Sequence, residues 1–258
     1  MAHEEKRKTP VSERALRIGA AVLALLVWQA AAMLADNPLL LVTPLAALGK
    51  LFALVRTAEF WRALGSSLLR IGGGFLLGLI VSAALAALSA RFRAVEILLR
   101  PYVAVVQSVP VASFIVIALL WFSARRIGFF ISFLMVFPVL YTNILQGLRA
   151  EDKKLLEMAQ VFRMKRRERI RSITIPALRP YLLAGEKTAL GLCWKAGVAA
   201  EVISMARDTI GGRLYDAKVY LEIAELFAWT VVIVLVSAIF SRLVLAMTKW
   251  LLRKWEGS

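Results

Sequence analysis

Apolar stretches of the length that crosses a lipid bilayer constrain this chain more than any other feature of its sequence. A transmembrane helix needs about 20 mainly apolar residues, and six stretches meet that rule: 17–35, 66–90, 103–122, 127–147, 181–201 and 225–248. The chain of 258 residues is 60% hydrophobic and only 19% charged, which is unusual for a soluble domain of its size. We therefore expect an all-α membrane protein with six transmembrane helices.

The basic residues predict the orientation of these spans. Of the 33 Lys and Arg, 21 lie in the N-terminal tail (counting Arg17 at its boundary), the 91–100 turn, the 149–180 loop and the C-terminal tail, whereas eight lie in the opposite loops and four within spans. Loops rich in Lys and Arg stay in the cytoplasm, so both termini are expected there. This predicts cytoplasmic tails at 1–16 and 249–258 and a transmembrane region at 17–248, whose 149–180 loop is cytoplasmic.

The N-terminal region permits two interpretations. A basic start followed by an apolar run is also typical of a cleaved secretory signal, with Ala30–Ala32 as the cleavage site. The run from Ile18 to Ala35 is long enough to span a bilayer, so an uncleaved first helix is preferred. After it, Thr43 and Pro44 form the start signal of a helix that we expect along the outer surface.

Other classes of protein receive little support. The net charge of +16 could indicate nucleic-acid binding, but the basic residues form short clusters between apolar runs, so no nucleic-acid partner is expected. With one His and one Cys, no metal site and no catalytic site is expected, and Cys193 is interpreted as a packing residue. The phosphate-loop pattern GxxxxGK[ST] does not occur, so no ATP chemistry is expected from this chain.

A basic stretch at 157–176, "EMAQVFRMKRRERIRSITIP", interrupts the apolar spans. The apolar residues at its start have the spacing of one helical face: Leu155, Met158, Ala159 and Phe162. A second apolar pattern stops at Pro176, where a helix cannot readily continue. We predict a pair of short helices. Contact with anionic lipid is one explanation for such a segment.

This stretch resembles the Glu-Ala-Ala loop of ABC importer permeases. The matching positions have the family's spacing: Glu157, Met158, Ala159, Ile173, Ile175 and Pro176. Arg163 stands where the family has Gly. Because Arg is disfavoured in a left-handed conformation, the replacement leaves open whether the family's turn between the two helices forms.

The resemblance extends from about residue 60 to the C-terminus. Segments 95–122, 137–159 and 177–203 are similar to the nitrate, sulfonate and taurine subfamily, which also includes thiamine-precursor importers. The resemblance implies a type I importer fold in the bacterial cytoplasmic (inner) membrane. It also implies a homodimer, two ATPase subunits that bind ATP and Mg, and an extracytoplasmic substrate-binding protein.

In such permeases this loop forms coupling helices that dock into the ATPase. The resemblance therefore implies that Leu155, Met158 and Phe162 form the docked face and that Glu157 is a pairing or capping group. Packing of Phe162 against the chain's own spans is the alternative.

Polar residues within or beside the spans are candidates for the translocation path: Gln107, Ser108, Asn143, Lys195 and Glu201. A Lys at the centre of a span costs about 2.5–3.5 kcal/mol, so Lys195 either lines the path and favours an anionic solute or pairs with Glu201 or another acid. Helix–helix hydrogen bonds explain the uncharged candidates equally well. Gly74 and Gly78 have the GxxxG spacing of a close helix contact, within this chain or with another.

The expected function is the membrane-spanning permease of an ATP-driven importer of a small anion. One alternative is import of a non-anionic solute such as a thiamine precursor. A secondary active transporter is the main alternative from another class, but it would need an internal repeat and an ion site at mid-depth, and the sequence shows no convincing example of either.

Overall fold

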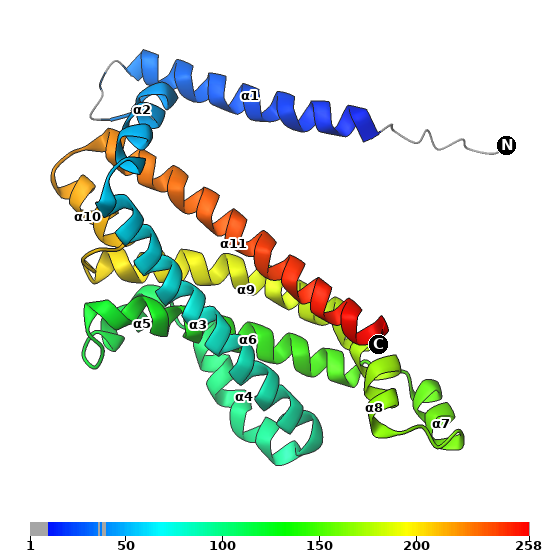
Figure 1. The fold of residues 1–258 in the computed structure, drawn as a ribbon. Coiled ribbons are helices and arrows are strands. Elements are labelled where there is room, and N and C mark those ends of the chain that lie inside the picture. The colour runs from blue at the N-terminus through cyan, green and yellow to red at the C-terminus, as the bar shows by residue number, and fades with distance from the viewer. Residues whose placement is uncertain (1–9, 36, 38–39, 258) are drawn as a thin grey trace.

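The computed structural model describes residues 10–35, 37 and 40–257, and the regular elements of these residues are all helices (Figure 1). They follow in the order α1 (Pro10–Ala35), α2 (Pro44–Val55), α3 (Ala58–Arg91), α4 (Arg93–Ser108), α5 (Val111–Ala118), α6 (Ala124–Arg149), α7 (Lys153–Val161), α8 (Arg166–Arg169), the π-helical turn η1 (Ile170–Thr174), α9 (Ile175–Ile203), α10 (Ile210–Val219) and α11 (Ile223–Gly257).

Four helices are long and apolar enough to cross a membrane, in the segments Ile18–Ala35, Ala58–Arg91, Ala124–Arg149 and Ile223–Trp255. Helices α4 and α5 together form a fifth candidate, but they meet at an angle of 105°. The single uninterrupted span expected at 103–122 is therefore wrong. Pro110 has no N–H to continue the helical ladder, and Val109 before it takes the extended conformation that a following proline favours.

The core forms where α6 packs between α3 and α9 (Figure 1). Glycines bring these backbones together: a Cβ added to Gly74 would lie 2.4 Å from the carbonyl oxygen of Phe129, and one added to Gly78 would lie 2.7 Å from Cγ1 of Val136. On the other side of α6, a Cβ at Gly197 of α9 would lie 2.5 Å from the Ser132 hydroxyl oxygen. The close neighbour of Gly74 and Gly78 is thus α6 of the same chain.

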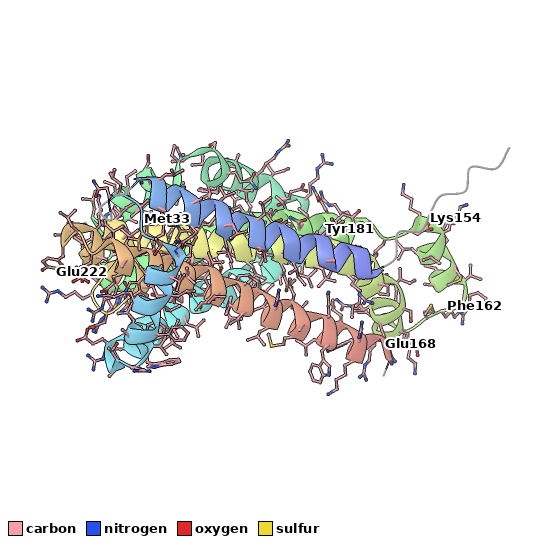
Figure 2. All side chains as sticks on the ribbon, turned by 90° about the horizontal axis from the view of Figure 1, so that it is seen from above. Met33, Lys154, Phe162, Glu168, Tyr181 and Glu222 are labelled. Atoms are coloured by element: carbon pink, nitrogen blue, oxygen red, sulfur yellow. The ribbon has the colours of Figure 1, made fainter. Side chains whose placement is uncertain are left out.

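The bundle has two different ends. Helices α7 and α8 project from one end, where α1 begins and α11 ends, whereas α2 and α10 lie at the opposite end (Figure 1). In Figure 2, Lys154, Phe162 and Glu168 mark the first end and Glu222 marks the second. We call these the α7 end and the α10 end.

Helix α2 begins as the sequence predicts. Thr43 is its N-cap, with the side-chain oxygen accepting a hydrogen bond from the Ala46 N–H at 3.3 Å, and Pro44 occupies the first turn. Lys50 ties α2 to the start of α11 through Glu222, at 2.8 Å, and Glu225, at 3.1 Å. The hydrogen bond from Lys50 holds the pKa of Glu222 below its usual value.

The helix does not stop at Pro176, so that prediction is wrong. Helices α8, η1 and α9 run without a break from Arg166 to Ile203. The Ile175 N–H bonds to the Ile170 carbonyl oxygen, five residues earlier, which makes one π turn before the proline. Pro176 then lies in the first turn of α9, where its missing N–H is tolerated. We call residues 166–203 the α8–α9 rod.

The glycine contacts predict a specific effect on stability. Gly74→Ala would place a methyl group against the α6 backbone, so the free energy of unfolding should fall by about 1–3 kcal/mol. Gly65→Ala in the same helix has no atom within 4 Å of the added Cβ and should be neutral or stabilising by up to about 1 kcal/mol. Denaturant unfolding of the detergent-solubilised chain measures both; equal stability of the two variants would contradict the close contact.

Candidate functional site

Helix α7 stands outside the bundle and has well-defined ends. The Asp152 carboxylate caps it by accepting a hydrogen bond from the Lys154 N–H at 2.9 Å. At its other end, the Arg163 N–H bonds to the Gln160 carbonyl at 3.0 Å and the Met164 N–H to the Ala159 carbonyl at 2.9 Å. This pair of bonds defines a Schellman turn.

The Schellman turn forms although it contains no glycine. Arg163 occupies its left-handed position with a φ of 49°. The question that the sequence left open is therefore answered: Arg163 keeps the turn, at a local cost of about 1–2 kcal/mol for a side chain in that conformation.

The apolar stripe of α7 is divided between two directions. Ala159 faces the chain and is 4% exposed, whereas Leu155, Met158 and Phe162 are exposed, Phe162 by 74%. Phe162 does not pack against the chain's own spans. Val161, which the periodicity did not include, is also exposed. We call Leu155, Met158, Val161 and Phe162 the α7 apolar face.

Glu157 lies in the middle of α7 with an exposed side chain. The capping role considered for it is wrong, because Asp152 caps the helix. Among the described residues Glu157 has no hydrogen-bond or ion-pair partner, so pairing with another subunit stays a prediction.

The second half of the basic stretch is fastened to the bundle. The Glu168 carboxylate accepts a hydrogen bond from the Lys165 N–H at 3.1 Å, which caps α8. Ile173 is 5% exposed and Ile175 is half-buried, whereas Pro176 is exposed. Ile173 and Ile175 therefore anchor the start of the α8–α9 rod and do not belong to an outward-facing surface.

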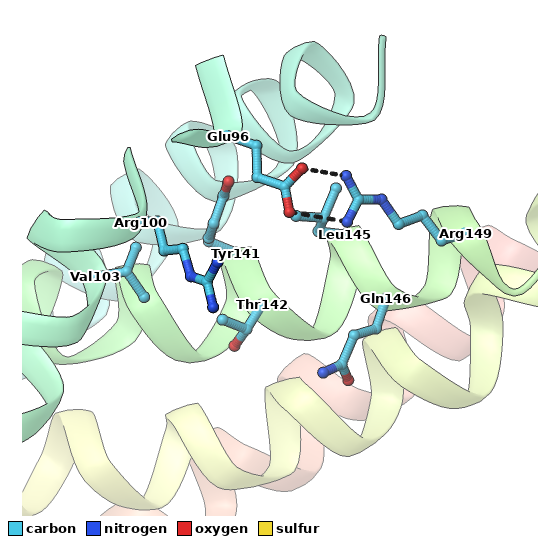
Figure 3. Close-up of a pocket in the computed structure, with 8 residues that line it drawn as sticks. All are labelled: Glu96, Arg100, Val103, Tyr141, Thr142, Leu145, Gln146 and Arg149. Atoms are coloured by element: carbon cyan, nitrogen blue, oxygen red, sulfur yellow. Dashed lines mark hydrogen bonds and ion pairs between the residues drawn. The ribbon is translucent and has the colours of Figure 1, made fainter. Parts of the chain in front are cut away.

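A cavity of about 470 Å³ lies between α4 and α6 (Figure 3). The Glu96 carboxylate of α4 accepts hydrogen bonds from both terminal nitrogens of the Arg149 guanidinium, with 2.9 Å between Nη1 and Oε1. Arg149 is the last residue of α6, and only three residues separate it from the start of α7. This ion pair connects α4 to the point where the projecting segment leaves the bundle. Arg100 also lines the cavity, so its lining carries more positive than negative charge.

The uncharged candidates for the path differ in position. Gln107 and Ser108 are exposed at the end of α4, beside the bend, and the Ser108 hydroxyl donates to the Val105 carbonyl at 3.2 Å. Asn143 is half-buried and donates to the Val139 carbonyl at 2.8 Å, and it lies against Gly185 of α9. Asn143 thus lies at the α6–α9 contact, and only Gln107 and Ser108 present polar groups to an open surface.

The two charged candidates are not paired with each other. Glu201 is fully buried, and its Oε2 accepts hydrogen bonds from the Ser67 hydroxyl at 2.7 Å and the Gly211 N–H at 3.1 Å. Lys195 is exposed on α9 and has no ion-pair partner among the described residues. The Lys195–Glu201 pair is therefore wrong, and a buried Glu201 does not line an open path.

A long bundle of apolar helices, four or five of them able to cross a membrane among the described residues, fits a multi-pass membrane protein. The chain belongs to the family of binding-protein-dependent transport system inner membrane components, whose pattern matches residues 74–257. It is an inner-membrane permease of an ABC importer and not the ATPase.

Relatives in this family carry different solute names. The aliphatic sulfonates transport permease SsuC of Bacillus subtilis is 28% identical over 80% of this chain and 74% of its own length. The bicarbonate transport permease CmpB of Synechococcus elongatus is 26% identical over 75% of this chain and 70% of its own. The riboflavin transport permease RibX of Chloroflexus aurantiacus is 26% identical over 92% and 88%, respectively.

The Schellman turn predicts the effect of restoring the family's glycine. Arg163→Gly should relieve the left-handed strain and increase amide hydrogen-exchange protection in the last turn of α7 by about two- to fivefold. Arg163→Val should decrease protection there, because a β-branched residue strongly disfavours positive φ. Exchange that is unchanged in both variants would contradict a left-handed turn at this position.

Proposed function

We propose that this permease crosses the membrane six times, with both termini in the cytoplasm, and carries a small anion through a homodimer. Two ATPase subunits that bind ATP and Mg would attach at the α7 end, and a binding protein would deliver the solute at the α10 end. Membership of the family establishes that the chain is a permease of an ABC importer. The number of crossings, the positions of the partners and the class of solute are proposed from the features below.

Six crossings follow from the four apolar spans, the bent α4–α5 pair and α9. Helix α9 runs the length of the bundle (Figure 1). It carries Glu186, Lys187, Lys195 and Glu201, which make it too charged to qualify as a span by composition. An even number of crossings agrees with α1 beginning and α11 ending at the α7 end, beside the most basic segment of the chain.

The α7 apolar face is the observation that best supports ATPase docking. Four apolar side chains project from a short capped helix that lies beyond the bundle, and the chain itself leaves them exposed. An exposed apolar cluster with charged residues around it is typical of a protein interface. Because α7 is capped at both ends, a force on this face would reach α6 through residues 150–152 and the α8–α9 rod through residues 162–165.

An anionic solute is supported by the position of Lys195. An uncompensated ammonium is too costly to face lipid at mid-helix, so the exposed Lys195 should face a second permease chain or an aqueous path. A path formed between two copies would bring two such lysines together and favour anions. The solutes named for SsuC and CmpB, sulfonates and bicarbonate, are anionic. RibX is named for riboflavin, so a non-anionic solute is the second candidate.

The docking proposal is tested by a charge on the α7 apolar face. Phe162→Asp should insert normally into the membrane but lose most co-purification of the ATPase and most transport, because a carboxylate would have to be buried in the interface. Gln160→Asp places the same charge on an exposed residue of α7 outside this face and should keep both. Intact ATPase binding and transport by Phe162→Asp would contradict the docked face. Failure of the native chain to bring down an ATPase would contradict the proposed docking as a whole.

The path proposal is tested at Lys195. Lys195→Met should assemble with its partners but lose transport of an anionic solute such as taurine, whereas Lys195→Arg should retain much of it. Lys187→Met changes a second exposed lysine, eight residues closer to the α7 end of the same helix, and is measured in parallel; loss of transport in Lys187→Met but not in Lys195→Met would contradict the assignment to Lys195. Failure of Lys195→Met to assemble would show that the lysine is an interface residue and not a path residue.

A further inference from the structure

The buried carboxylate of Glu201 lies where three helices meet. Its side chain is fully buried near the end of α9, and it contacts Ser67 of α3 and Gly211 of α10. These contacts connect residues that are far apart in the sequence, since Ser67 and Glu201 are 134 positions apart.

Each hydrogen bond of this cluster joins a different pair of elements. The Ser67 hydroxyl donates to Glu201 Oε2 and at the same time accepts the Ile210 N–H at 2.9 Å. Glu201 Oε2 also accepts the Gly211 N–H at 3.1 Å. The first two N–H groups of α10, which have no partner inside that helix, are thus bound by side chains of α3 and α9. We call Ser67, Glu201, Ile210 and Gly211 the α10 joint.

The backbone segments around the α10 joint are too closely packed to shift relative to one another. A Cβ at Gly211 would lie 2.3 Å from Cβ of Glu201, and one at Gly212 would lie 2.1 Å from the Ala206 carbonyl oxygen. The loop between α9 and α10 contains two non-glycine residues with positive φ, Met205 at 50° and Asp208 at 55°. Strained residues of this kind persist only where the surrounding structure holds them. The start of α10 is therefore fixed rigidly to α9.

The same α9 helix reaches the other end of the molecule. The α8–α9 rod extends from Arg166, two residues after the Schellman turn, to Ile203, two residues after Glu201. The helical turns follow one another over this whole length, but α8 bends away from the axis of α9 at the π turn before Pro176 (Figure 1). One continuous helical segment thus connects the part of the chain beside the α7 apolar face with the α10 joint.

We infer that Glu201 is a positioning residue that couples the docking of the binding protein at α10 to the ATPase contact at α7, through the α8–α9 rod. The inference rests on the proposed function, which places these partners at opposite ends. A displacement of α10 would move α3 and α9 together, because the carboxylate and the Ser67 hydroxyl hold all three. By thermodynamic reciprocity, the state of the ATPase changes the affinity for the binding protein by the same route.

Ser67→Ala is the decisive variant. It removes the hydroxyl that connects α3 to both α9 and α10 and changes the side-chain volume little, so the fold should be kept. Glu201→Gln tests the joint differently, because the amide oxygen can accept both bonds that Oε2 accepts. Asp208→Asn is the matched control: it changes an exposed acid in the α9–α10 loop that makes no side-chain hydrogen bond among the described residues.

The measurement is ATP hydrolysis by the full complex in lipid nanodiscs, with and without the binding protein that co-purifies with it. In Ser67→Ala the basal rate should stay near that of the native complex, while the stimulation by the binding protein should be lost. Glu201→Gln and Asp208→Asn should keep most of the stimulation.

Two results with Ser67→Ala would overturn the inference. Retained stimulation would show that the joint does not carry the coupling, and an equal fall of basal and stimulated rates would show a merely structural role. Both differ from failure of the proposed function, in which the native complex contains no ATPase or is not stimulated by any binding protein.

Discussion

The close contact of α6 with α3 on one side and α9 on the other is the constraint on which the rest of the structure depends. Lipid offers little hydrophobic driving force between helices, so they associate by close packing and by internal hydrogen bonds. Glycines at 74, 78 and 197 let the backbones approach as closely as they do here. With α6 and α9 held in this way, the segment 150–174 between them has fixed ends, and α7 projects from the bundle in a defined direction.

The buried acids of α9 hold the helix to its neighbours, whereas its exposed basic side chains are available to a solute or another chain. Glu186 and Glu201 point into the bundle and receive hydrogen bonds, Glu186 from the Thr248 hydroxyl at 2.9 Å. Lys195 is exposed and has no hydrogen-bond or ion-pair partner in the described part of the chain. The two acids fasten α9 to α11, α3 and α10, so the helix moves with its neighbours. Lys195 and the likewise exposed Lys187 are the charges of α9 that remain for a solute or a second permease chain.

Local patterns in the sequence predicted the helices but not how their ends are joined. Apolar length predicted where the bundle helices lie, and the Thr43–Pro44 pair predicted the start of α2, because both depend only on neighbouring residues. The bend at Pro110 and the π turn before Pro176 depend on how each proline's missing N–H is accommodated in three dimensions. A proline in the sequence therefore indicates a discontinuity without showing whether the helix breaks or continues.

The site shows the same division. Helical spacing identified Leu155, Met158 and Phe162, which lie on one outward face, but it included Ala159, whose burial is set by the rest of the chain. Val161 was missed, because its exposure follows from α7 leaving the bundle and not from periodicity. Ser67 was missed because nothing near it in the sequence indicates a contact with Glu201. The Lys195–Glu201 pair was wrong because proximity on one helix does not determine which way each side chain points.

The central claim is that α7 inserts its apolar face into a separate ATPase subunit. The most direct measurement is photo-crosslinking from benzoylphenylalanine at position 162 in the native membrane, with mass spectrometry of the products. The account predicts a crosslink from position 162, on the α7 apolar face, to an ATP-binding protein. No such crosslink should form when the same group replaces the exposed Gln160, which lies outside this face. Crosslinks from position 162 to lipid or to the permease alone would contradict it.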